Sequence, residues 1–151
     1  MNSTEEAIKT VKDVISSQRL AVLSTQKDGY PYANLVAFAP TNNNKALVFV
    51  TGRDTRKYQN MKYGNEVAIL FDTRWGSSVD FNSIVAITAL GKVTELEDQD
   101  TKQPKTAYID KHPHLERFIE KSSNAVMRVD VDRYIVASFS EVRSIPVDHI
   151  D

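Results

Sequence analysis

Apolar residues near the start of the chain recur at helical spacing. They stand three or four positions apart, at Ile8, Val11, Val14 and Ile15, as they do on the buried face of a helix. Ser3 and Glu6 have the spacing of a capping box, in which two side chains satisfy backbone donors at a helix start. The pattern therefore predicts an N-terminal helix that covers one end of the core.

After residue 18 the pattern changes to short apolar segments separated by turn sequences. Such segments predict strands, here over residues 20–25, 32–39, 46–51, 67–71, 84–96, 125–131 and 134–142. Turns are predicted at Lys27-Asp28-Gly29, where glycine tolerates a positive φ, and at Asn42-Asn43-Asn44. Gly91, inside the fifth segment, predicts a β-bulge or a sharp bend.

Three other segments do not have strand character. Residues 54–63 are expected to form a short helix. Residues 98–121 are charged and helix-like, and Pro104 and Pro113 are expected to break them into pieces. Residues 144–151 are expected to form a C-terminal tail.

Many short antiparallel strands with few helices are typical of a closed or partly closed barrel. The predicted fold is mostly β with peripheral helices, in a single domain over residues 1–151. The regular alternation of strand and helix that builds a parallel sheet is missing, which argues against a doubly wound dinucleotide-binding domain.

Composition narrows the possible partners. The chain has 19 basic and 20 acidic residues, so it has no overall field that would attract nucleic acid or an anionic membrane. It has no cysteine, which excludes disulfides, thiolate nucleophiles and cysteine-ligated metals. No segment has the apolar length that spans a bilayer, and the N-terminus does not resemble a signal peptide. A cytoplasmic protein that binds neither nucleic acid nor membrane is expected.

Histidines offer little support for a metal site. His112 and His114 alternate around Pro113, but no third histidine or carboxylate stands at a supporting spacing. An exposed turn between helices is the expected structure here, and no metal site is predicted. His149, in the expected tail, is a further candidate for a haem or metal ligand.

Basic residues gather where the third predicted strand passes into a helix. The segment 51–57 contains Thr51, Gly52, Arg53, Thr55, Arg56 and Lys57. Glycine allows a tight turn, hydroxyls can donate hydrogen bonds, and the free N–H groups of a helix start attract anions. The segment therefore suits a phosphate. From the residues alone, a solvated helix start with scattered basic side chains explains the pattern equally well.

Three groups of residues, taken together, weigh in favour of the phosphate. They are AVLST at 21–25 with DGYP at 28–31, then VFVT at 48–51 with TRK at 55–57 and NEVA at 65–68, and finally LGKVTEL at 90–96. In this order and spacing they resemble the pyridoxamine 5′-phosphate oxidase-like, FMN-binding split-barrel family. The resemblance extends over about half of the chain.

The resemblance implies an antiparallel split β-barrel that forms a homodimer and holds FMN at the subunit interface. In the family, a hydroxyl-Arg-Lys triplet after the third strand holds the phosphate, and the flavin ring lies along the second strand, partly against backbone groups. The cofactor-binding residues that this implies are Asn34, Leu35, Val36, Ala37, Val50, Thr51, Thr55, Arg56 and Lys57. Trp75, in the loop after the fourth strand, is expected to be a core or dimer-packing aromatic, with closure over the cofactor as the alternative.

The chain also departs from the family pattern. True pyridoxamine-phosphate oxidases have Arg where this chain has Asn34, Lys where it has Ala39, and Gln where it has Ala86. Pyridoxamine-phosphate oxidation is therefore not expected.

The expected function is that of an FMN-binding oxidoreductase acting on an unidentified small molecule, and no side chain is assigned as catalytic. The alternative is a non-catalytic protein of the same fold that binds FMN, the deazaflavin F420 or haem. A cofactor-free dimer that serves in protein interaction is a third hypothesis.

Overall fold

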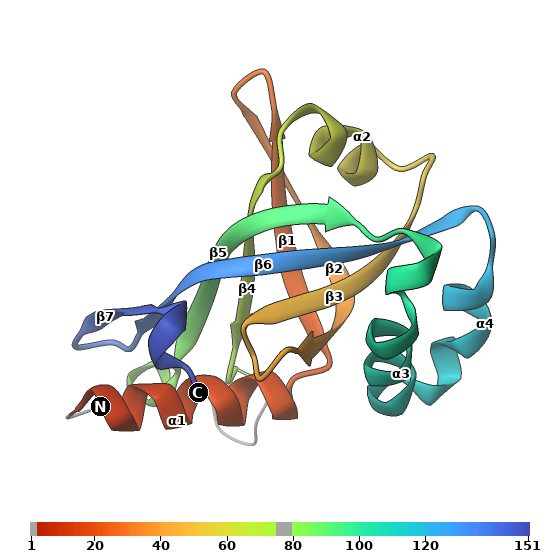
Figure 1. Cartoon of the computed structure of the whole chain (residues 1–151). Helices are drawn as coiled ribbons and strands as arrows, with labels where there is room; N and C mark the ends of the chain where they lie inside the picture. The colour runs from red at the N-terminus through yellow and green to blue at the C-terminus, as the bar shows by residue number, and fades with distance from the viewer. Residues whose placement is uncertain (1–2, 75–79) are drawn as a thin grey trace.

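The computed structural model describes residues 3–74 and 80–151, and these form a barrel of antiparallel strands (Figure 1). The strands are β1 (Leu20–Lys27), β2 (Tyr30–Thr41), β3 (Ala46–Gly52), β4 (Glu66–Asp72), β5 (Ala86–Glu95), β6 (Asn124–Ala137) and β7 (Val142–Pro146). They are hydrogen-bonded in the order β3-β2-β1-β4-β5-β6-β7, and an additional pairing of β3 with β6 closes the first six into the barrel. The predicted mostly β, antiparallel barrel is confirmed.

The helices lie at the two ends and on one side of the barrel (Figure 1). α1 (Thr4–Ser17) covers one end, α2 (Arg56–Tyr63) lies at the other end, and α3 (Lys102–Lys111) and α4 (Glu116–Glu120) pack on the side. Short 3₁₀ turns are η1 (Phe81–Ser83), η2 (Asp98–Asp100), η3 (Pro113–Leu115) and η4 (Val147–His149). None of the helices in the described residues is long and apolar enough to cross a membrane. Trp75 lies outside the described residues.

The predicted N-terminal helix and both predicted turns are confirmed. The Ser3 hydroxyl accepts a hydrogen bond from the Glu6 backbone N–H at 3.1 Å, which caps α1. Asp28 and Gly29 have φ values of 54° and 81°, as in a two-residue hairpin turn whose twist matches its strands. Asn42, Asn43 and Asn44 also have positive φ, which asparagine tolerates better than most residues.

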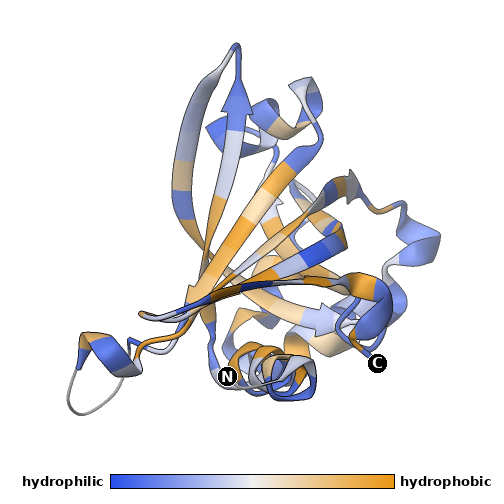
Figure 2. Ribbon diagram, turned by 90° about the vertical axis from the view of Figure 1, so that its left-hand side faces the viewer, coloured by the Kyte–Doolittle hydropathy of each residue, from blue (hydrophilic) through white to orange (hydrophobic). Residues whose placement is uncertain are grey.

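Apolar side chains form two clusters on opposite faces of the barrel wall. The larger fills the barrel and includes Leu23, Phe38, Phe49, Ile69 and Tyr134, together with the buried stripe of α1. The smaller lies under α3 and α4 and includes Val48, Val50, Tyr108, Ile119 and Val126. Figure 2 shows these apolar positions along the strands and on the inner side of α1. The outer face of β1, β4 and β5 has no helix packed on it in the described part of the chain (Figure 1).

The last two predicted strands are wrong, because β6 is one strand of 14 residues. Residues 130–133 have the polar composition of a turn, but in the structure they form a β-bulge within β6. Leu90 pairs with Arg133 and Gly91 with Val131, so Asp132 is the extra residue. The bulge bends β6 while it continues, and it confirms the irregularity predicted at Gly91.

The predicted effect of Pro104 and the predicted tail are also wrong. Pro104 is the third residue of α3, where its missing N–H would have no intrahelical acceptor, so it does not break the helix. Pro113 does end α3, as predicted. Residues 144–151 form the end of β7 and then η4, and Ile150 is fully buried in the barrel core.

His112 is buried rather than exposed in a turn. It is 1% exposed, and its Nε2 lies 2.7 Å from the Phe38 carbonyl oxygen. Burial lowers the pKa of His112, and the neighbouring Lys111, whose pKa burial lowers to about 8, donates a hydrogen bond to the Ile15 carbonyl. These contacts join α3 to β2 and α1, so the pair contributes to packing. No group of three or more potential metal-binding side chains is found in the described residues.

Candidate functional site

The loop between β3 and α2 is held by its own hydroxyl groups. Thr55 caps α2: its Oγ1 accepts a hydrogen bond from the Tyr58 N–H and donates one to the Gly52 carbonyl at 2.8 Å. The Thr51 and Thr55 hydroxyls lie 3.0 Å apart. A Cβ atom at Gly52 would lie 2.8 Å from Asp54 Oδ1, so a larger residue here would require the Asp54 side chain to move. Thr51 and Thr55 therefore shape the loop.

The Arg53 side chain is held by groups outside this loop. Its Nη2 lies 2.7 Å from Glu95 Oε2, and its Nη1 donates to the Ser122 carbonyl at 2.8 Å. The Tyr58 hydroxyl donates to the other Glu95 oxygen. Burial raises the pKa of Glu95, but the hydrogen bonds from Tyr58 and Arg53 outweigh burial and lower it overall. Glu95, at the end of β5, thus holds the loop through Arg53 and the first turn of α2 through Tyr58.

Replacing Glu95 with Gln is expected to destabilise the protein by about 1 kcal/mol at pH 7, because charge-assisted hydrogen bonds at a partly exposed site are lost. The folded-state pKa of Glu95 is lowered, so its contribution exists above the unfolded value of about 4.3 and disappears as pH falls through the lower folded value. Urea unfolding of both proteins at pH 7 and pH 3 measures this. Equal differences at the two pH values would contradict the assignment.

Arg56 and Lys57 are the basic side chains at the start of α2. Neither forms an ion pair with a described residue, and the Arg56 guanidinium lies 5.2 Å from the centre of the Tyr32 ring. Lys57 is half-buried, and this burial lowers its pKa. The backbone N–H groups of both residues precede any intrahelical acceptor. Two cations and two N–H groups are thus available to an anion here.

The barrel wall is split beside this loop. β2 pairs with β1 over residues 30–37 but with β3 only over 38–41. The edge of β2 at Asn34–Ala37 therefore has no hydrogen-bonded strand on the side of β3, and the end of β3 has none on the side of β2. Free backbone N–H and C=O groups along such an edge can bond the polar rim of a flat ring.

The side chains predicted along this edge point in opposite directions. Asn34 and Val36 follow the inward direction of Phe38, and Val36 is buried in the barrel core. Leu35 is 64% exposed on the outer face, where Ala37 packs against the smaller cluster and Val50 is buried within it. Asn34 Oδ1 is buried without a hydrogen-bond partner.

The residues present fit a flavin phosphate. Arg56, Lys57 and the helix start supply donors for a dianion, and they lie beside a split with unpaired backbone groups. The unpartnered Asn34 oxygen could accept a hydrogen bond from a ligand hydroxyl. Thr51 and Thr55 belong to the same loop, but their hydroxyls are engaged within it.

Sequence reasoning missed three residues of this site. Glu95 and Tyr58 hold Arg53, and Tyr32 contacts Arg56. Glu95 is part of the LGKVTEL segment, yet its distance from Arg53 along the chain gives no sign of the contact. Tyr32 could have been predicted beside the site, because it stands two residues before Asn34 and side chains two positions apart lie on the same face of a strand.

A family model described as pyridoxamine 5′-phosphate oxidase matches residues 7–136. No curated protein sequence matches the chain.

Solved structures share the fold. A haem-binding protein from Mycobacterium smegmatis has a TM-score of 0.85 at 16% identity, with 95% of this chain and 59% of that chain covered. A protein from Clostridium acetobutylicum related to general stress protein 26 has a TM-score of 0.76 at 16% identity, covering 99% and 100%. An FAD-binding protein from Mesorhizobium loti has a TM-score of 0.67 at 18% identity, covering 87% and 91%. The split barrel and the family match together show that the chain belongs to the pyridoxamine 5′-phosphate oxidase family.

Proposed function

We propose that the protein binds FMN through its phosphate at the β3–α2 loop and uses it as an oxidoreductase acting on a small molecule. When bound, FMN supplies hydride or electron transfer at its ring. Arg56, Lys57 and the first N–H groups of α2 hold the phosphate. The unpaired edge of β2 at Asn34–Ala37 orients the ring, and Leu35 packs against it.

The observation that carries this proposal is the pair of cations at the start of α2. Lys57 is half-buried, its pKa is lowered by that burial, and it forms no ion pair with a described residue. A cation in such surroundings gains from a bound anion, and a helix start adds hydrogen bonds to a phosphate. Neighbours described as FAD-binding and haem-binding support a flavin or haem ligand in this fold. Between these two ligands, the cations and the helix start at Arg56 and Lys57 favour the flavin, because it carries a phosphate.

Haem is the second candidate ligand, and this chain has fewer suitable groups to bind it. The usual axial ligands are histidine, cysteine, methionine or tyrosine, and the chain has no cysteine. His112 Nε2 is engaged by the Phe38 carbonyl oxygen, 2.7 Å away. His149 belongs to η4, next to the end of the chain.

An absorption spectrum of the purified protein, before and after addition of FMN, tests the proposal. Flavin absorption bands that remain with the protein through gel filtration are expected. A Soret band would select haem instead. A colourless protein that does not retain added FMN would contradict the proposal.

The second part of the proposal is a homodimer with the cofactor at the subunit interface. The outer face of β1, β2 and β4 carries apolar side chains, of which Leu20 is 50% and Leu35 is 64% exposed. Val22 and Leu70 lie side by side on this face, because their Cα atoms are partners across β1 and β4. Contiguous apolar surface of this kind favours association. Leu35 would then lie between the flavin and the second subunit.

Replacing Leu70 with Asp is expected to convert the dimer to a monomer, because a carboxylate would be buried in an apolar interface without a partner. Light scattering after gel filtration measures the mass. The matched control is Thr106→Asp, an exposed position on α3, away from this face. A variant at Leu70 that keeps the mass of the wild-type protein would show that the interface lies elsewhere.

A further inference from the structure

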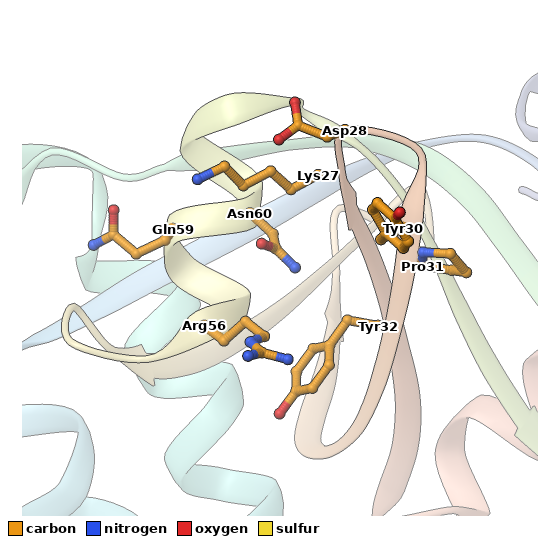
Figure 3. A pocket seen from close by; sticks show the side chains of 8 residues that line it. All are labelled: Lys27, Asp28, Tyr30, Pro31, Tyr32, Arg56, Gln59 and Asn60. Atoms are coloured by element: carbon orange, nitrogen blue, oxygen red, sulfur yellow. The ribbon is translucent and has the colours of Figure 1, made fainter.

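A pocket of about 520 Å³ opens between the β1–β2 hairpin and α2. Figure 3 shows the hairpin residues on one side and the side chains of α2 on the other. The volume lies within the range of small-molecule sites. Apart from Arg56 and Tyr32, no residue of the proposed FMN site lines this pocket, and FMN itself ends at its phosphate.

The pocket continues directly from the phosphate loop. Arg56 lines it and is also the first residue of α2, next to the cap Thr55. The Arg56 guanidinium lies 5.2 Å from the centre of the Tyr32 ring, which also lines the pocket. A group attached to a phosphate at the helix start would therefore extend over Arg56 and between hairpin and helix.

The lining combines aromatic rings, cations and an amide. Tyr30 is 79% exposed, and Tyr32 follows it on the same strand. Lys27 and Arg56 supply positive charge at the two ends of the pocket (Figure 3). The carboxylate of Asp28 also lines the pocket, and it raises the pKa of Tyr63. Aromatic rings on which a neutral base can stack, together with cations that can pair with an attached phosphate, suit a nucleotide.

Asn60 at the back of the pocket supplies a second, independent indication. It is 95% buried, since its exposed fraction is 5%. Its Nδ2 donates to the buried Thr25 hydroxyl at 3.0 Å, and its Oδ1 accepts no hydrogen bond from a described residue. A buried amide with an unused acceptor, lining a pocket, suits the amino edge of a purine.

We propose that this pocket is the subsite for the adenylate half of a flavin dinucleotide, so that the protein binds FAD more tightly than FMN. The inference rests on the proposed function, because the flavin phosphate must first be held at the β3–α2 loop. The second phosphate is placed near Arg56, and the adenine packs on the tyrosine rings toward Lys27 at the other end of the pocket. The amino group of the adenine donates to Asn60 Oδ1.

Calorimetric titration of the purified apoprotein with FMN and with FAD tests the subsite. FAD is expected to bind about tenfold more tightly or better, which is what stacking of one base typically contributes. The double substitution Lys27→Ala with Tyr30→Ala should remove most of this advantage and leave FMN affinity unchanged, since neither residue is part of the phosphate loop. Lys62→Ala, an exposed lysine of α2 outside the pocket, is the matched control and should change neither affinity.

The possible failures are distinguishable. If FMN binds and FAD binds no more tightly, the subsite is wrong and the proposed function stands. If the double substitution lowers both affinities by the same factor, these residues act on the phosphate loop and the subsite is again wrong. If neither flavin binds, the proposed function fails and the subsite fails with it.

Discussion

Replacing Arg56 and Lys57 together with alanine is expected to abolish retention of FMN and to leave the barrel folded. Each charge-assisted hydrogen bond to a phosphate contributes about 1.5–3 kcal/mol, so the loss of two weakens binding at least about 100-fold. The fold should persist, because Arg56 is exposed and Lys57 only half-buried, and neither forms an ion pair in the described residues. Flavin absorbance after gel filtration and a titration with FMN measure the effect.

A charge-matched variant separates a local effect from a general one. Lys62→Ala with Lys92→Ala removes the same charge from two exposed positions outside the loop, and it should retain FMN like the wild-type protein. Unchanged flavin occupancy in the Arg56/Lys57 variant would show that the phosphate does not lie at the start of α2.

Replacing Gly91 with Ala is expected to be the most destabilising single substitution considered, by about 3 kcal/mol or more. A Cβ atom at this position would lie 2.3 Å from the Asp130 carbonyl oxygen, which is backbone and cannot rotate away. The bulge between β5 and β6 would have to open, and with it the barrel wall. For a chain of this length the thermal midpoint should fall by roughly 10 °C.

Gly64 provides the matched control for this substitution. A Cβ atom there would meet nothing within 4 Å, and the φ of −147° suits any residue. Gly64→Ala should therefore change the free energy of unfolding by less than about 0.5 kcal/mol. Similar stability of the two variants in urea unfolding would show that the close approach at Gly91 is relieved in solution.

Local sequence signals predicted most of the fold correctly. The helical stripe, the Asp28-Gly29 turn and the asparagine run depend on residues within a few positions of one another, so they can be recognised without the fold. The errors arose where distant residues decide the structure. Whether Asp130 to Arg133 turns or continues depends on Gly91 in the neighbouring strand, and the C-terminal segment is ordered because Ile150 enters the core beside α1.

The candidate site follows the same rule. Local spacing predicted that Thr55, Arg56 and Lys57 lie at a helix start. The family resemblance implied that a flavin phosphate binds there. The sequence could not show that the Arg53 side chain forms an ion pair with Glu95, because the two residues are 42 positions apart. Nor could it show that the hydroxyls of Thr51 and Thr55 bond within the loop, or that β2 and β3 separate beside it.

Comparing FMN with riboflavin tests the central claim most directly, because the two ligands differ only in the phosphate. Titration of the wild-type apoprotein should show FMN binding at least about 100-fold more tightly than riboflavin. In the Arg56→Ala/Lys57→Ala variant the ratio of the two affinities should fall by about 100-fold or more, because only the backbone N–H groups of α2 then remain to hold the phosphate. Equal affinities in the wild-type protein, or a ratio that the double substitution leaves unchanged, would contradict a flavin phosphate held at the start of α2.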